Sequence, residues 1–161
     1  MKQIDFNLSA FLPYRLAVLS ERVSRRLAIE YERMHDLSVA EWRVLVHLLR
    51  CQEVSVREIH NCVNLDKPRV SRAVSRLEAA GLVAKMQDGN DARLVAISLT
   101  DQGRAALDDI LPEAMAVEKQ LVNSLTSEEF ELLCTIMEKL HEALDTDPSA
   151  RPRSRMDLHG I

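Results

Sequence analysis

Apolar residues recur at three- and four-residue steps over most of the chain, which is the period of an α-helix that buries one side. The pattern predicts a long first helix over residues 13–34 and shorter helices over about 39–50, 55–63 and 67–81. Residue types that favour helix ends stand at these boundaries. They are Pro13, Ser38 with Glu41, Ser55 with Glu58, Asp66 and the closing Gly81.

The hydrophobic period changes to two after the fourth helix. Short segments rich in Val, Leu and Ile lie at 82–86 and 93–99, and residues 87–92 between them are turn formers. Ile97 and Leu99 alternate with small or polar residues. This segment predicts a β-hairpin with one buried and one solvated face.

Helical spacing returns after the hairpin. Thr100 can cap a fifth helix that contains Pro112 as a kink, and Thr126 with Glu129 forms a capping box before a sixth helix. Residues 145–161 lack periodicity, and we expect them to form a mobile tail.

The order of three helices and a hairpin over residues 38–99 is that of a winged helix-turn-helix. We therefore expect a single domain over residues 10–144 that is mainly α (α+β). In this domain, long helices at 13–34 and 101–144 flank the winged unit.

Composition limits the class of protein. The 161 residues suit one domain, and 21 basic against 25 acidic residues give a net charge of −4. This balance excludes a globally basic coat for nucleic acid but allows a local basic face. We expect neither a membrane helix nor a signal peptide, and the expected location is cytoplasmic. The three cysteines lack CxxC spacing and do not form a disulfide framework.

The fourth predicted helix has a local charge opposite in sign to the net charge of the chain. Residues 67–81 carry four basic side chains and one acid, Glu78, so the local sum is +3. Val70, Ala73, Val74 and Leu77 share one side, so the basic and hydroxyl side chains lie on the other. Arginine on such a face can read guanine in the major groove, and serine can contact bases or phosphates. A solvated helix surface is the alternative interpretation.

The stretches SVAEWRVLVHLL, VREIHNCVNLDKPRVSRAVSRLEAAGLVAK and DARLVAISLTDQGR resemble the MarR transcription regulators. Within them LDKPRVSR, LEAAGLV, an Asp-x-Arg wing and LT-x-x-G follow in order, and the resemblance covers about residues 10–144. It implies a sequence-specific regulator of double-stranded DNA: a homodimeric repressor of a palindromic operator. A small ligand, such as a phenolic or aromatic acid, would release the repressor.

The resemblance assigns DNA contacts to individual positions. In the wing, Arg93 matches an arginine that enters the minor groove, and Asp91 matches the acid that steadies it, although a plain turn-stabilising ion pair is the alternative. The wing departs from the family pattern at Ala92 and Lys85, where further basic residues or arginine are common, so its grip on DNA is expected to be weak or salt-sensitive. The matching recognition-helix positions are Lys67, Pro68, Arg69, Ser71, Arg72, Ser75 and Arg76.

Two apolar seams follow the hairpin, and they suit helix packing. Packing inside one chain is one explanation, but the resemblance favours a homodimer whose DNA half-sites lie about 34–36 Å apart. The first seam is Leu107, Ile110, Ala114, Val117 and Leu121, and the second is Phe130, Leu133, Met137, Leu140 and Leu144.

The resemblance also implies a ligand site between the dimer helices and the DNA-reading unit. Arginines there could hold a carboxylate and aromatic rings could stack on the ligand. Trp42 as a core residue and Arg43 in a surface ion pair are the alternatives. The candidate residues are Tyr14, Arg15, His35, Trp42 and Arg43. The spacing of the five histidines favours no metal site, and we expect no cofactor.

Two alternative functions remain open. A thiol-based redox regulator would use Cys51 as its exposed thiol, because Cys62 and Cys134 fit the pattern of small buried hydrophobes. A winged helix used only for protein contact would favour aromatic and apolar residues on the fourth helix instead of arginines. An enzyme is not expected, since the chain has no Gly-rich phosphate loop, nucleophile elbow or paired catalytic acids.

Overall fold

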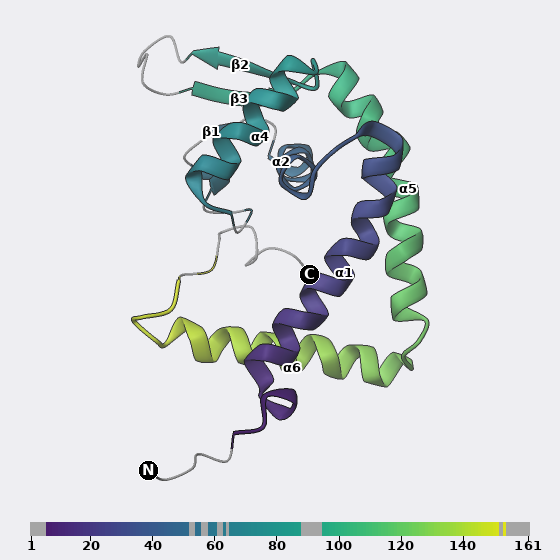
Figure 1. The fold of residues 1–161 in the computed structure, drawn as a ribbon, viewed down its shortest axis with the longest axis vertical. Coiled ribbons are helices and arrows are strands. Elements are labelled where there is room, and N and C mark those ends of the chain that lie inside the picture. The colour runs from purple at the N-terminus through teal and green to yellow at the C-terminus, as the bar shows by residue number, and fades with distance from the viewer. Residues whose placement is uncertain are drawn as a thin grey trace.

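The computed structural model describes residues 6–51, 54–55, 58–60, 63, 65–87, 95–151 and 153. Helices dominate, and the sheet is small. In Figure 1, α2, α4 and the sheet form a head, α1 and α5 lie side by side leading away from it, and α6 lies at the far end. The elements in order are η1 (Leu8–Ala10), α1 (Leu12–His35), α2 (Val39–Arg50), β1 (Val54–Ser55), α4 (Lys67–Ala79), β2 (Val83–Gln87), β3 (Val95–Leu99), α5 (Asp101–Val122) and α6 (Ser127–Asp145). This architecture confirms the predicted winged helix-turn-helix with long flanking helices.

The helix starts follow from their capping residues. The Ser38 hydroxyl accepts the N–H of Glu41 (3.3 Å), and the Glu41 carboxylate accepts the N–H of Ser38 in return (2.7 Å). Thr126 begins α6 with a second reciprocal capping box. Asp66 begins α4 by accepting the N–H of Arg69 (2.7 Å). Each cap pairs backbone donors that the first turn of a helix leaves without partners.

The wing is a three-stranded antiparallel sheet in the order β1-β3-β2. Ile97 and Leu99 on β3 are buried, as the alternation predicts. The prediction missed β1, because two residues are too few to show a period. Ser55 pairs with Ala96 in the sheet, and its hydroxyl also accepts the N–H of Glu58 (3.2 Å). Residues 58–60 are helical.

The ends of α4 and the hairpin pack closely against the start of α5. Gly81 has the left-handed φ of 72° that the predicted helix stop requires. The Thr100 hydroxyl donates to the Gly81 carbonyl (2.7 Å) and accepts the N–H of Gly103 (3.0 Å). A Cβ at Gly103 would collide with the carbonyl oxygen of Leu82, so glycine is what lets α5 approach this closely.

The main core joins the head to the flanking helices. Trp42 on α2 is buried and stacks on Tyr31 of α1, with ring centroids 5.1 Å apart. Burial raises the pKa of Tyr31 to about 12, so its hydroxyl stays protonated at neutral pH. Leu107 and Ile110 of α5 are fully buried in the same cluster.

The two predicted seams differ in the structure. Leu107, Ile110 and Val117 on α5 are buried within the chain, as packing inside one chain predicts, whereas Leu121 at the end of that seam is 44% exposed. Helix α6, by contrast, buries none of its residues. Its seam residues are between 36% and 54% exposed: Phe130, Leu133, Met137, Leu140 and Leu144.

The chain after α6 returns towards the head (Figure 1). Arg151 donates to the carbonyl of His60 (3.1 Å), and Arg153 donates to both carboxylate oxygens of Glu138 (2.6 and 3.1 Å) and to Asp145 (3.0 Å). The described part of the expected tail thus contacts the rest of the chain, its mobility stays a prediction, and its last eight residues lie outside the described residues. None of the described helices is long and apolar enough to span a bilayer.

Candidate nucleic-acid interface

Helix α4 separates its residues into a buried side and an exposed side, as predicted. Val70, Ala73, Val74 and Leu77 are at most 4% exposed and pack into the core. The outward side carries every predicted recognition-helix position, and all of them are exposed: Lys67, Pro68, Arg69, Ser71, Arg72, Ser75 and Arg76. The structure therefore brings the predicted DNA-reading residues together on one solvent-facing surface.

The cations of this surface differ in their partners. Among the described residues, the side chains of Lys67, Arg69 and Arg72 form no ion pair. Arg76 forms an ion pair with Glu41 of α2, with its Nε 3.1 Å from the carboxylate. Unpaired guanidinium groups on an exposed helix are available to carboxylates, phosphates or guanine bases.

The acids near α4 are already engaged. Glu78, on the last turn, pairs with Lys85 of β2 at 2.6 Å, which ties the wing to the recognition helix. Asp66 uses its side chain to cap the helix. Among the described residues, no carboxylate therefore forms an ion pair with the cations in the first two turns of α4.

His60 lies near the start of this surface. Desolvation lowers its pKa, and the cations Lys67 and Arg151 act in the same direction, while Asp66 opposes them. Its Nδ1 atom is buried and has no hydrogen-bond partner among the described residues. A neutral imidazole here adds no positive charge to the surface near neutral pH.

The wing-tip positions Asp91, Ala92 and Arg93 lie outside the described residues. Lys85, which precedes them on β2, is engaged with Glu78. The one lysine in the described part of the wing is therefore engaged in an ion pair within the chain.

The five candidate ligand residues occupy two separate places in one chain. Tyr14 and Arg15 are exposed in the first turn of α1. His35 ends α1 and contacts Asp109 at 3.3 Å. At 1.5 Å per residue, the 21 positions from Tyr14 to His35 span about 31 Å. A single chain therefore does not bring these two groups together.

The other two ligand candidates have contacts of their own. Trp42 is 8% exposed and packs in the core, which is the alternative that the sequence left open. Arg43 donates to the carbonyl of Val63 (3.4 Å), a contact that connects α2 to the segment before α4. Both residues thus make contacts within the chain: Trp42 in the core, and the half-buried Arg43 with the segment before α4.

The described thiols are partly buried. Cys51 follows α2, and it packs against the main core. Cys134 is half-buried on α6, and Cys62 lies outside the described residues. The described part of the chain contains no group of three His, Cys, Asp or Glu side chains that could hold a metal ion.

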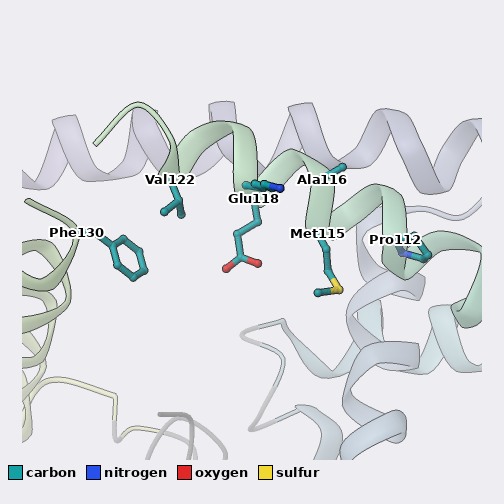
Figure 2. Close-up of a pocket in the computed structure, with 7 residues that line it drawn as sticks. Pro112, Met115, Ala116, Glu118, Val122 and Phe130 are labelled. Atoms are coloured by element: carbon teal, nitrogen blue, oxygen red, sulfur yellow. The ribbon is translucent and has the colours of Figure 1, made fainter. Parts of the chain in front are cut away.

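A pocket of about 590 Å³ lies between the second half of α5 and the start of α6 (Figure 2). Glu118 and Lys119 supply its charged groups, and apolar side chains supply the rest. The figure shows Met115, Glu118 and Val122 extending to the same side of α5. The lining residues are Pro112, Met115, Ala116, Glu118, Lys119, Val122 and Phe130.

The ion pair between Glu41 and Arg76 is a feature of this region that the sequence did not predict. The sequence predicted a capping box from Ser38-Val-Ala-Glu41. The helical pattern of α4 predicted that Arg76 is exposed, but not its partner. The pairing depends on how α2 packs against α4, and no spacing along the chain encodes that packing.

A helix-turn-helix whose second helix exposes cations beside an antiparallel wing defines a winged-helix DNA-binding protein. A profile of the MarR family matches residues 35–94. The chain is 32% identical over 120 residues to an uncharacterized HTH-type transcriptional regulator of Bacillus cereus, covering 74% of this chain and 80% of that protein. The chain therefore belongs to the MarR family of DNA-binding transcription regulators.

Other relatives agree with this assignment. The HTH-type transcriptional repressor MdtR of Bacillus subtilis is 26% identical over 147 residues, which is 91% of this chain and 94% of that one. An organohalide-sensing regulator in its 2,4-dichlorophenol-bound form has a TM-score of 0.73 at 25% identity, covering 86% and 82% of the two chains. A MarR family regulator of Streptomyces coelicolor in complex with DNA has a TM-score of 0.77 at 23% identity, covering 91% and 98%.

Proposed function

We propose that two copies of this chain bind a palindromic operator and repress transcription until a small aromatic acid or phenol binds. The observation that carries the DNA-binding part is the outward surface of α4, where the predicted recognition residues are all exposed. Among the described residues of this acidic chain, Lys67, Arg69 and Arg72 have no ion-pair partner, and cations gathered on one helix in this way attract phosphates.

The residues of this surface have different roles in the proposal. Ser71, Arg72 and Ser75 face the base edges in the major groove, where arginine binds guanine through two hydrogen bonds. Lys67 and Arg69, at the start of α4, bind the phosphate backbone. By the family resemblance, Arg93 enters the minor groove, steadied by Asp91.

The exposed apolar side of α6 supports the homodimer. A helix with a continuous apolar stripe and no buried residue is stable when another surface covers the stripe. The pocket beside Phe130 extends the same apolar surface to α5 (Figure 2). A second copy of the chain covers both in the proposed dimer, and its two-fold symmetry matches a palindromic operator.

A selection of bound duplexes from a random pool tests the proposed DNA binding. The full chain is mixed with the pool at moderate salt, and the enriched sequences are read. We expect an inverted repeat with half-sites about one helical turn apart and two chains per duplex. Enrichment of no sequence would refute the proposed function.

The ligand part of the proposal has a separate test. Similarity to a regulator in a 2,4-dichlorophenol-bound form supports a small aromatic ligand. One chain does not bring Tyr14 and Arg15 near His35, so the proposed site lies between two chains. In this proposal Trp42 and Arg43 support the site from α2. We expect 2,4-dichlorophenol or benzoate to raise the melting temperature and displace the selected duplex. If neither compound does so, this class of ligand is excluded.

A further inference from the structure

Glu41 is a buried acid in the first turn of α2, with a side chain only 4% exposed. One of its carboxylate oxygens, Oε2, accepts the backbone N–H (2.7 Å) and the hydroxyl (2.6 Å) of Ser38. Its other oxygen, Oε1, lies 3.1 Å from Nε of Arg76 on α4 and forms an ion pair with it. Both oxygens of one carboxylate are thus engaged, the first within α2 and the second with the recognition helix.

This arrangement exceeds what a helix cap requires. A capping box needs only one oxygen of the N3 residue, and glutamine performs the role as well as glutamate. A buried charge is costly unless charged and hydrogen-bonded partners surround it, and Arg76 supplies the charge. The negative charge of Glu41 therefore has a partner on the DNA-reading helix, and its cap function alone does not explain it.

The contact uses a small part of the arginine. A guanidinium group has five N–H donors, and the ion pair with Glu41 is made at Nε. The side chain of Arg76 remains 67% exposed, on the same side of α4 as Arg72. The ion pair holds the guanidinium group towards α2, and the exposed terminal N–H groups stay accessible to a second acceptor.

We propose that Glu41 is a positioning residue for DNA binding: it holds Arg76 over the α2–α4 contact so that the terminal N–H groups of Arg76 bind a backbone phosphate. The inference rests on the proposed function. Arg76 stands in the last turn of α4 and about 100° around the helix from Ser75, so it lies at the edge of the side that faces the bases. A phosphate is therefore its partner, and Arg72, one turn earlier, is left to read bases.

The test measures the dissociation constant of the selected duplex at several salt concentrations. The variants are Glu41→Gln, Arg76→Ala and their combination, and urea unfolding of each confirms that it is folded. Glu41→Gln keeps the capping oxygen and removes the charge. We expect it to weaken binding about three- to tenfold in the wild-type background and to have no further effect beside Arg76→Ala.

Arg76→Ala should weaken binding to all duplexes by a similar factor and lower the salt slope by about one, as the loss of a phosphate contact does. Ser38→Ala is the matched control, since it removes the cap and leaves the carboxylate beside Arg76. We expect Ser38→Ala to lower the free energy of unfolding while changing DNA affinity less than twofold, a ratio within about 0.4 kcal/mol.

Arg76→Lys supplies an independent check, because it keeps a cation beside Glu41. A single ammonium group cannot hold the carboxylate and present a planar pair of N–H donors, so we expect weaker binding despite the retained charge. Wild-type affinity for Arg76→Lys would overturn the inference, as would a Glu41→Gln effect that persists unchanged beside Arg76→Ala. If the wild-type chain selects no duplex at all, the proposed function itself fails.

Discussion

His47 is a buried histidine in α2, only 6% exposed. Desolvation lowers its pKa from the ordinary value of 6.5; Arg50 acts in the same direction and Glu58 opposes it. The folded chain therefore keeps a neutral imidazole at a pH where the unfolded chain has already bound a proton. The stabilising contribution is fully present above about 6.5 and is lost as the pH falls from there towards the lowered pKa of the folded state.

Replacing this residue tests the sign of the effect. In urea unfolding experiments, the free energy of unfolding should decrease as the pH is lowered from 7.5 to 5.5. The slope for one proton is at most about 1.4 kcal/mol per pH unit. His47→Gln should reduce this slope, and some slope remains because His60 is lowered in the same sense. His141→Gln, on the exposed surface of α6, is the control. An unchanged slope in His47→Gln would contradict the assignment.

At the scale of single elements, the junction of α4, the wing and α5 depends on one glycine. Gly103→Ala places a methyl group against the carbonyl of Leu82, and that carbonyl also accepts the N–H of Thr100 (3.1 Å). Backbone atoms on both sides must shift, so we expect a loss of about 1–3 kcal/mol in the free energy of unfolding. Arg104→Ala, exposed and next in sequence, should change it by less than about 0.5 kcal/mol. Equal effects of the two changes would show that the close approach is not required.

The elements themselves were largely predictable from the sequence, because their start signals are local. Ser38 with Glu41, Asp66, and Thr126 with Glu129 place three helix starts where the structure has them. The strand β1 was missed because its pairing with β3 joins residues far apart in the chain. The two seams after the hairpin were predicted with the same role, yet most of the α5 seam faces the core, whereas the α6 seam faces solvent.

The candidate site was predictable in part. The period of α4 fixed which residues face outward, since four buried positions leave the recognition residues on the opposite side. Pairing between elements was not predictable, because Glu41–Arg76 and Lys85–Glu78 depend on how helices and strands pack together. The separation of Tyr14 and His35, by contrast, already follows from the predicted helix over 13–34, because these residues stand at its two ends.

At the scale of the whole molecule, the exposed apolar side of α6 bears on whether the chain is a monomer or a dimer. Met137→Glu places a charge in the middle of the exposed seam, where Met137 is 47% exposed in a single chain. If a second copy covers this surface, the buried charge is costly and the dimer dissociates. We expect sedimentation to give twice the 18.3 kDa chain mass for the wild type and the single-chain mass for the variant.

Thr135→Glu is the matched control for the dimer, because it introduces the same charge on the opposite side of α6. It should leave the mass at that of two chains. A wild-type mass equal to one chain at micromolar concentration would remove the dimer from the account. Dissociation of both variants would show that charge alone, and not the seam, controls assembly.

The most direct test of the central claim, that the outward surface of α4 reads DNA bases, is a binding series with Arg72→Ala. The selected duplex is changed one base pair at a time, and the dissociation constants of the wild type and of Arg72→Ala are compared. We predict that the wild type loses about 1–3 kcal/mol of binding free energy at one guanine in each half-site, and that Arg72→Ala binds all bases equally there. If Arg72→Ala keeps the wild-type affinity and base preference throughout the series, the α4 surface is not the reading surface.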